Sequence, residues 1–310
     1  MWCRECRRHI SRKKRINDSF VRRMQLLYGK PVADRIHTEI RERVNRLSIQ
    51  PKLAVILVGD DPASHLYVGL KEKEAGADGI AFEKHLFVSN VGEDEVVSMV
   101  ARLNDDTSVH GILIQLPLPK GFNVDRIVGS IDPEKDADGF HSRNISAFLA
   151  GDVSRIPVFP EALIELLLSS EQPLKGQSAF LVVNSEHFGR VMLKACESQG
   201  LVGRIIPSER LLAEAEMTLE ARVIVSACGV PNLIRRVNIL PNAIIIDGGI
   251  VKDETGRTVG DVDGEGIAGE TGFLSPVPGG VGPITIACLL RRVVTLAEEK
   301  QKSRENMVSS

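Results

Sequence analysis

The chain of 310 residues is long enough for two ordinary domains, and its 43% hydrophobic, 26% charged and 4% aromatic residues are typical of a globular protein. This balance excludes low-complexity, collagen-like and wholly disordered chains, and no run of about 18 apolar residues predicts a membrane span. Five cysteines in a chain of this size favour a reducing, cytoplasmic compartment over a disulfide framework. The net charge of −2 conceals an uneven distribution.

The first 23 residues are strongly basic, with nine Lys and Arg against two acids, whereas the remaining chain has 30 bases against 39 acids. We expect residues 1–23 to be a disordered, dispensable extension, because they show no apolar pattern able to pack. The alternatives are an Arg-rich organellar targeting sequence, a nucleic-acid-binding arm, and half of a zinc site at Cys3, Cys6 and His9. Because a second ligand pair is missing, no metal is expected, and the acidic body argues against a nucleic-acid partner.

From Met24 the apolar pattern alternates between strands and helices. Strands are predicted at 53–59, 81–88 and 111–116, and helices at 32–47, 64–78, 93–104 and 123–131. Ser64 is well placed to cap the second of these helices. Alternation of this kind predicts a parallel sheet with helices on both faces.

The same alternation then restarts in the second half of the chain. Strands are predicted at 178–183, 201–206, 222–227 and 243–246, and helices at 160–170, 188–198 and 284–300. The segment 251–283, rich in Gly, Asp and Pro, indicates a loop with one hairpin. We therefore expect two parallel-sheet α/β domains, 24–150 and 151–282, with the last helix (283–300) packing back on the first domain.

Two polar groups lie at positions where a parallel sheet places its ligand crevice. Tyr67 and Lys71 have the i,i+4 spacing that puts both side chains on one helix face, where a lysine of lowered pKa could move protons. Taken alone, this spacing is more typical of a solvated helix face, where Lys and Tyr are common. Gln115 interrupts an apolar strand just before Pro117, and its amide either serves the site or only holds a loop.

Three loop motifs also allow more than one interpretation. The turn around Asp136 and Asp138 suits an amine-rich ligand, but taken alone a simple Asx turn is the better explanation. The segment 276–283, Pro-Val-Pro-Gly-Gly-Val-Gly-Pro, lets backbone approach a ligand at a helix start but lacks the Lys of a nucleotide P-loop. The Gly-x-Gly-x-x-Gly match at 264–269 is rejected, because neither a strand before it nor a helix after it is predicted there.

Five motifs in order resemble the bifunctional methylenetetrahydrofolate dehydrogenase/cyclohydrolase family over about Leu26 to Glu298. They are Ser64-His-Leu-Tyr-Val-Gly-Leu-Lys-Glu-Lys73, Gly111-Ile-Leu-Ile-Gln-Leu-Pro-Leu-Pro119, Lys135-Asp-Ala-Asp-Gly-Phe-His141, Gly260-Asp-Val-Asp263 and Pro276-Val-Pro-Gly-Gly-Val-Gly-Pro-Ile-Thr285. The resemblance implies a folate-binding domain facing a Rossmann domain across a cleft, in a homodimer. It also implies oxidation of 5,10-methylene- to 5,10-methenyltetrahydrofolate with NADP or NAD, followed by hydration to 10-formyltetrahydrofolate.

The resemblance also assigns residues. Lys71 is implied as the catalytic lysine, Gln115 as the residue that positions it, and Asp138 as the group that holds the pterin ring. Tyr67 is implied to stack along the folate. The other implied binding residues are Ser64, Pro278, Gly279 and Gly280 for the substrate, and Ile250, Thr285, Asn184, Ser185 and Ser208 for the cofactor.

The second half departs from the family pattern. A Gly-Arg-Ser segment is replaced by Asn184-Ser185, which is one residue shorter, and a His-Ser pair is replaced by Pro207-Ser208. A Pro-Cys-Thr-Pro stretch is here 157–160, Pro-Val-Phe-Pro. Losing the cradle Gly and an Arg predicts weak dinucleotide binding beside an intact cyclohydrolase site.

Three questions stay open at this point. The neighbouring Glu209 and Arg210 argue oppositely on NAD against NADP. A folate-binding pseudoenzyme is the main alternative function. Short-chain dehydrogenases also use Tyr-x-x-x-Lys, but there the pair follows the cofactor loop, whereas Tyr67 precedes the Rossmann-like half.

Overall fold

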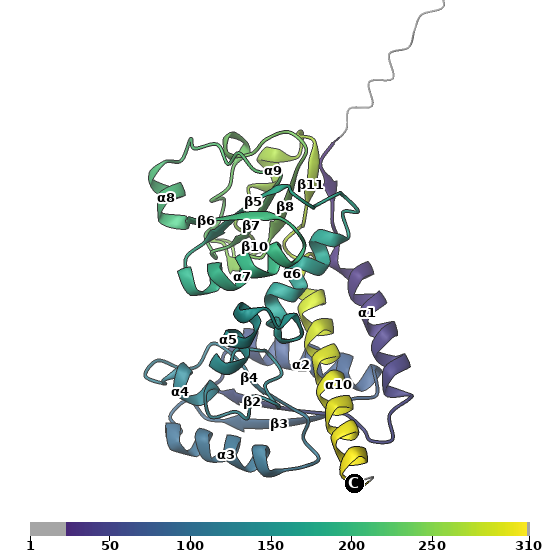
Figure 1. The fold of residues 1–310 in the computed structure, drawn as a ribbon. Helices are drawn as coiled ribbons and strands as arrows, with labels where there is room; N and C mark the ends of the chain where they lie inside the picture. The colour runs from purple at the N-terminus through teal and green to yellow at the C-terminus, as the bar shows by residue number, and fades with distance from the viewer. Residues whose placement is uncertain (1–22, 309–310) are drawn as a thin grey trace, which may run out of the picture.

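The structure, a computed structural model, describes residues 23–308 and contains two α/β units joined by long helices (Figure 1). The predictions for the basic tail, including the zinc half-site, concern residues 1–22, which lie outside this range, and Arg23, which lies within it. Within 23–308, no helix combines the length and hydropathy of a membrane span. No group of three or more His, Cys, Asp or Glu in the same range could hold a metal ion.

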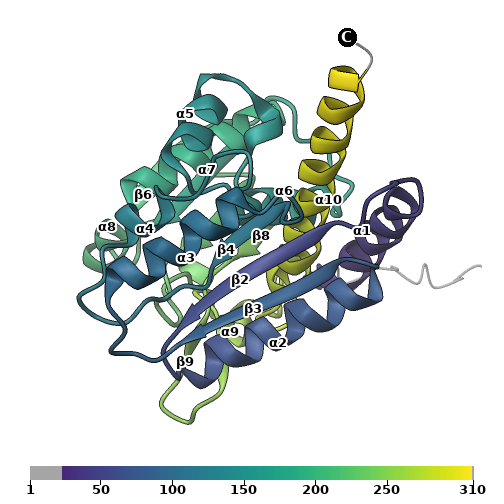
Figure 2. The same ribbon diagram turned by 90° about the horizontal axis from the view of Figure 1, so that it is seen from below.

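The first sheet is entirely parallel and has the order β3-β2-β4. Its strands are β2 (Lys52–Val58), β3 (Ala81–Phe87) and β4 (Gly111–Ile114), and its helices are α1 (Gly29–Val44), α2 (Pro62–Ala77), α3 (Glu93–Asp105), α4 (Val124–Val128) and α5 (Ser142–Ala150). Strand β2 is buried on both faces, since Leu53 packs in the core with α1 and α2, and Ile56 packs in the core with α3. Figure 2 shows α2 and α3 on opposite faces of this sheet. Two-sided burial explains why β2 is a continuous apolar run.

The second sheet is also parallel, with the order β1-β11-β8-β7-β5-β6. Its strands are β1 (Gln25–Leu26), β5 (Ser178–Val183), β6 (Val202–Pro207), β7 (Val223–Ala227), β8 (Ala243–Asp247) and β11 (Gly272–Leu274). The elements around it are η1 (Val153–Arg155), α6 (Val158–Leu168), α7 (Glu186–Ser198), α8 (Ser208–Ala213), η2 (Arg236–Asn238) and α9 (Gly264–Ile267). The predicted hairpin is formed by β9 (Val251–Lys252) and β10 (Thr258–Val259).

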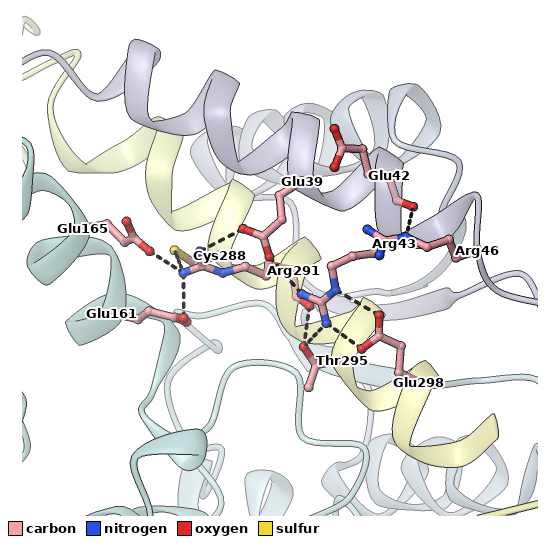
Figure 3. Close-up of polar contacts among 10 residues, drawn as sticks. All are labelled: Glu39, Glu42, Arg43, Arg46, Glu161, Glu165, Cys288, Arg291, Thr295 and Glu298. Carbon is pink, nitrogen blue, oxygen red and sulfur yellow. Dashed lines mark hydrogen bonds and ion pairs between the residues drawn. The ribbon is translucent and has the colours of Figure 1, made fainter. Parts of the chain in front are cut away.

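The last helix, α10 (Val281–Val308), connects the two units. It packs along α1 and α6 and reaches β2 and β4, so it does return to the first unit as expected. Figure 3 shows Arg291 of α10 between acids of α1 and α6, with Nη2 2.8 Å from Glu161 Oε1 and 2.7 Å from Glu165 Oε1. Nearby, Arg43 of α1 pairs with Glu298 of α10 at 2.9 Å. Half-buried ion pairs of this kind reinforce an apolar contact that already joins α1, α6 and α10.

Several predicted boundaries differ from the structure, and two of the differences have a clear physical reason. Residues from 24 were assigned to the first domain, but Gln25 and Leu26 pair with β11 in the second sheet. A strand of two residues is too short to produce an alternating pattern. Helix α7 begins at Glu186 rather than at 188, because Ser185 caps it by accepting a hydrogen bond from the Phe188 N–H at 3.3 Å.

Candidate functional site

Helix α2 starts directly after β2 and carries the predicted Tyr67–Lys71 pair. Its N-cap is Asp61, not Ser64 as the sequence suggested: Asp61 Oδ2 accepts hydrogen bonds from the Ser64 N–H at 2.8 Å and the Ser64 Oγ–H at 2.7 Å. The side chain of Ser64 is buried in this cap. The cap fixes where α2 begins and therefore where Lys71, two turns further on, meets the carboxyl end of the sheet.

Lys71 and Gln115, which are 44 positions apart in the sequence, are brought into direct contact. The Lys71 Nζ donates a 2.7 Å hydrogen bond to Gln115 Oε1. The Gln115 Nε2 donates to Leu116 O at 2.7 Å, and its backbone N–H donates to Ile56 O at 2.9 Å. The buried amide is thus oriented with its oxygen toward the lysine, which is the arrangement that a positioning role requires.

The loop that carries Asp138 is built by its neighbour Asp136. The Asp136 carboxylate accepts hydrogen bonds from the Gly139 N–H (3.0 Å), the His141 N–H (2.8 Å) and the Asn144 Nδ2 (2.9 Å). Asp136 therefore has the structural role that an Asx turn predicts. The Asp138 carboxylate, in contrast, accepts no hydrogen bond from residues 23–308, which leaves it available to a ligand.

The two ionisable groups shift each other's pKa. Burial lowers the pKa of the Lys71 ammonium, and the negative charge of Asp138 partly opposes this. Burial raises the pKa of Asp138 to about 6; Lys71 and Arg292 act to lower it, and Asp136 acts to raise it. A lysine made easier to deprotonate beside an unpaired carboxylate is suited to proton transfer at an electrophilic centre.

The remaining predicted substrate residues surround this pair less closely. Tyr67 is half-buried one turn before Lys71, and burial raises the pKa of its hydroxyl. Gly279, with φ of +103°, accepts a hydrogen bond from the Gly29 N–H at 2.8 Å. A Cβ at Gly29 would overlap the carbonyl oxygen of Gly280, so the loop containing Pro278 lies against the start of α1. Binding of substrate by these residues stays a prediction.

In the second sheet the strand order reverses between β5 and β7, which is where a dinucleotide binds in folds of this kind. Asn184 follows β5, and its Nδ2 donates a 3.0 Å hydrogen bond to the carbonyl oxygen of Cys228, which follows β7. The side chain therefore bridges the two strand ends across the crevice. A glycine at this position would leave that space open.

The start of α7 retains one feature of a phosphate cradle and lacks another. A Cβ at Gly189 would lie 3.0 Å from Val183 Cγ2, so this glycine allows the close helix–strand packing that dinucleotide folds use. Ser185 caps the helix, but Glu186 places an exposed carboxylate in its first turn. A carboxylate stabilises the helix there and repels a second anion such as a pyrophosphate.

Two of the nearby arginines are already engaged. Arg204 stacks over the ring of Phe180, with its Cζ 5.9 Å from the centroid, and Arg210 forms an exposed ion pair with Glu214 at 3.3 Å. The residues present are thus compatible with the fold of a dinucleotide domain. Their charges, however, complement the negatively charged phosphates of NADP poorly. Of the other predicted cofactor residues, Ile250 is 55% exposed after β8, and the Thr285 hydroxyl donates to Val281 O at 3.2 Å.

A buried carboxylate pair, which sequence reasoning missed, joins the loops behind this crevice. Asp261 accepts hydrogen bonds from the Ser226 Oγ–H at 2.6 Å and from the N–H groups of Cys228 and Val230 at 2.7 and 2.8 Å. Asp247 accepts from three backbone N–H groups, and burial raises its pKa to about 7. Burial raises the pKa of the Cys228 thiol to about 11, and the predicted Ser208, buried at the start of α8, only weakly opposes this through its hydroxyl.

Two cavities lie apart from Lys71. One of about 500 Å³ is lined by the hairpin segment 257–260 together with Asp247, Pro276 and Val277. The other, of about 440 Å³, is lined by Arg143 of α5 and by Arg155. Neither includes Gln115 or Asp138, so the polar cluster rather than cavity size identifies the candidate site.

Arg292, the cation facing Asp138, was also missed. It is 7% exposed, and its Nη2 donates to the carbonyl oxygen of Ile156. The available signal was its spacing: Arg292 lies four residues after Cys288 and four before Leu296, both buried, so it occupies the apolar face of α10.

Comparisons with known proteins agree with this architecture. Residues 27–138 match the sequence model for the catalytic domain of tetrahydrofolate dehydrogenase/cyclohydrolase, and residues 157–301 match the model for its NAD(P)-binding domain. The bifunctional protein FolD of Nitrosospira multiformis is 39% identical over 278 residues, covering 89% of this chain and 96% of that protein.

Solved structures give the same result. The FolD crystal structure from Campylobacter jejuni has a TM-score of 0.82 and 36% identity, covering 89% of this chain and 99% of that one. The Trypanosoma brucei dehydrogenase-cyclohydrolase, solved with NADP and an inhibitor, has a TM-score of 0.83 and 29% identity, covering 89% and 98%. The chain therefore belongs to the tetrahydrofolate dehydrogenase/cyclohydrolase family.

Proposed function

We propose that this protein hydrates 5,10-methenyltetrahydrofolate to 10-formyltetrahydrofolate in one-carbon metabolism, at a site formed by Lys71, Gln115, Asp138 and Tyr67. The observation that carries the proposal is the 2.7 Å hydrogen bond between Lys71 and Gln115, beside an Asp138 carboxylate that accepts no hydrogen bond from residues 23–308, in a member of this family. The alternative of a pseudoenzyme has no support, because the related proteins named above are bifunctional enzymes.

The chemistry follows from the electrostatics. The methenyl carbon is electrophilic, and a water molecule that adds to it must lose a proton. Burial lowers the pKa of Lys71, which makes the neutral amine that accepts this proton easier to form. Lys71 then returns the proton to N5 as the carbon–N5 bond breaks and its electron pair moves to nitrogen. The carbinol hydroxyl loses its proton to solvent as its oxygen becomes the carbonyl oxygen, which leaves the formyl group on N10.

Gln115 and Asp138 have separate tasks in this scheme. Gln115 accepts a hydrogen bond from Lys71 and so aims its nitrogen at the reacting carbon. Asp138, when ionised, accepts hydrogen bonds from the N–H groups of the pterin ring and holds the substrate beside the lysine. Loss of the methenyl absorbance in buffer without any dinucleotide, corrected for uncatalysed hydrolysis, measures the reaction. A rate equal to the uncatalysed one would refute the proposal.

For the dehydrogenase half of the family's activity, we infer weak dinucleotide binding. The bridge from Asn184 to Cys228 and the carboxylate of Glu186 support this inference, since the first occupies the crevice and the second repels phosphate. We expect NADP to bind about 30- to 1000-fold more weakly than to an unaltered cradle, from a loss of roughly 2–4 kcal/mol. Calorimetric titration with NADP and NAD measures this. Low-micromolar affinity for NADP, with normal methylene oxidation, would contradict it.

A homodimer in the cytoplasm is proposed with this function. The family resemblance supports the dimer, and β6 offers an exposed sheet edge whose first residue, Val202, is 66% exposed. Light scattering coupled to size-exclusion chromatography tests the dimer, and a monomer mass at micromolar concentration would refute it. The location rests on the cysteine content alone, and cell fractionation tests it.

A further inference from the structure

The cation Arg292 lies on α10, far in sequence from the predicted catalytic residues. Its side chain is 7% exposed, and its Nη2 donates to the carbonyl oxygen of Ile156. Two residues after Ile156, the Val158 N–H donates a 3.0 Å hydrogen bond to the carbonyl oxygen of Asp138. The segment from Ile156 to Val158 therefore connects the guanidinium to the backbone of the Asp138 loop.

The guanidinium also approaches this loop directly. A Cβ built on Gly139 would lie 3.6 Å from Arg292 Nη1 and 2.9 Å from Pro157 Cα. Gly139 has φ of +80°, so the absence of a side chain serves both the turn and the close approach of the cation. No residue in 23–308 accepts a hydrogen bond from Nη1, which leaves this end of the guanidinium facing the loop.

Four charged groups determine the electrostatics around Asp138. Lys71 of α2 and Arg292 of α10 stabilise its negative charge, and Asp136 of its own loop destabilises it. Glu161 of α6 lies behind the guanidinium, with Oε2 3.9 Å from Arg292 Nη2. Because the proposed mechanism uses Lys71 in its neutral form, Arg292 is then the one cation of this set whose charge persists through catalysis.

We propose that Arg292 is a positioning residue of the hydration site, which anchors the Asp138 loop through Ile156 and keeps the Asp138 carboxylate ionised while Lys71 is neutral. The inference rests on the proposed function, because it assigns Arg292 a task in that reaction. The effect of Arg292 on the hydration rate is largest at the pH where Asp138 begins to protonate.

The test is the pH dependence of kcat/KM for methenyltetrahydrofolate hydration by the full chain. We expect Arg292→Gln to move the acid limb upward by about 0.5 to 1 pH unit, because an ionised Asp138 loses a nearby positive charge. Arg292→Lys retains the charge and should keep the limb within about 0.2 unit, while KM rises a few-fold because the contact with Ile156 weakens. The proposal would be overturned if the acid limb of the kcat/KM profile in Arg292→Gln lay at the same pH as in the wild type. It would also be overturned if KM in Arg292→Lys were unchanged.

Arg291→Gln is the matched control. Arg291 is adjacent on α10 but faces Glu161 and Glu165 rather than Asp138 (Figure 3). Its loss should reduce stability without moving the acid limb, and a shift equal to that of Arg292→Gln would contradict a specific role for Arg292.

A second readout separates this inference from the proposed function. Titration of the 13C-labelled aspartate carboxyl carbons by NMR, with Asp138 assigned from Asp138→Asn, follows ionisation without any turnover. An Asp138 pKa that is higher in Arg292→Gln than in the wild type supports the inference even if hydration is absent. An equal pKa overturns it even if hydration is present. Should Arg292→Gln not fold, Arg292→Lys is measured in the same way and must retain the wild-type value.

Discussion

The two parallel sheets end in crevices of opposite character. At the end of the first sheet, Asp138 accepts no hydrogen bond from residues 23–308, and Lys71 makes its single hydrogen bond to Gln115. At the end of the second sheet, Asn184 is hydrogen-bonded to the chain itself, and the first turn of α7 already holds a carboxylate. One crevice presents groups to a ligand, and the other satisfies its polar groups internally.

This contrast indicates that a domain can keep its fold while the residues of its ligand site change. The second sheet keeps the strand order, the start of α7 and the close packing at Gly189 that a dinucleotide domain needs. These features stabilise the domain whether or not a cofactor binds. The groups that would contact phosphate contribute little to packing, so their replacement leaves the fold intact.

The largest expected effect is at Lys71. Lys71→Met should reduce hydration by a factor of about 10² to 10⁴, the range of general acid–base catalysis, because it removes the group that carries the proton in the proposed mechanism. Far-UV circular dichroism and folate affinity should stay near wild-type values, since methionine fills the same space. A variant that keeps most of its activity would show that the first crevice does not work as described.

Replacing Gln115 should have a smaller effect. Gln115→Ala removes the acceptor that aims Lys71, a charge-assisted bond worth about 1.5–3 kcal/mol, so kcat should fall roughly 10- to 100-fold. Gln115→Glu is the informative companion variant. Its carboxylate would stabilise the charged lysine, raise its pKa and move the pH optimum upward, whereas an unmoved optimum would argue against the lysine as the proton carrier.

The second crevice gives the next prediction. Asn184→Gly removes the bridge to Cys228 and should tighten NADPH binding about tenfold, measured by fluorescence titration, with no change in hydration. Glu186→Gln should add a few-fold more by removing a negative charge from the helix N-terminus. Asn242→Gly, in a distant turn with φ of +64°, controls for a general effect of glycine. Equal affinity in wild type and Asn184→Gly would show that the bridge does not limit binding.

The pH dependence of hydration tests the first crevice without mutation. The pKa of Asp138 is raised to about 6, and the ionised form is the one that accepts hydrogen bonds from the substrate. Activity should therefore be retained above about pH 6 and fall as the pH drops through that value. In Asp138→Asn this limb should disappear, so a limb that persists would assign the titration to another group.

The smallest expected effect on hydration comes from the buried carboxylates. Asp261→Asn leaves part of the hydrogen bonding of Ser226, Cys228 and Val230 unsatisfied, at a cost of roughly 1–3 kcal/mol. Thermal unfolding should begin several degrees lower, while the hydration rate at 25 °C stays within twofold. A matching loss of hydration would mean that the two crevices are coupled.

The long apolar segments were predictable because periodicity reports burial directly. β5 was predicted with its exact ends, and the hairpin of β9 and β10 was confirmed. The two-residue β1 and three-residue β11 were missed, because strands this short show no period and form only through pairing with β8 and each other. Asp61 was overlooked as a cap because Ser64 has the same preference and lies closer to the apolar run.

In the candidate site, too, some residues were predictable from the sequence and others were not. Spacing on one helix predicted that Tyr67 and Lys71 share a face, and family motifs supplied Gln115 and Asp138. Arg292 and Asp261 could not be assigned from sequence, because each has a backbone partner, 136 and 33 positions away, that carries no side-chain identity. Only the packing of α10 against the Asp138 loop brings Arg292 to its partner, and only the second sheet brings Asp261 to the residues that follow β7.

If the first crevice works without the second, hydration needs no dinucleotide. This is tested by the rate of methenyltetrahydrofolate hydrolysis by the full chain in dinucleotide-free buffer, beside Lys71→Met at the same concentration. We expect turnover by the wild type that does not change when NADP is added, and a rate at the uncatalysed level for the variant. Wild-type hydrolysis that appears only with NADP present, or that persists in Lys71→Met, would contradict it.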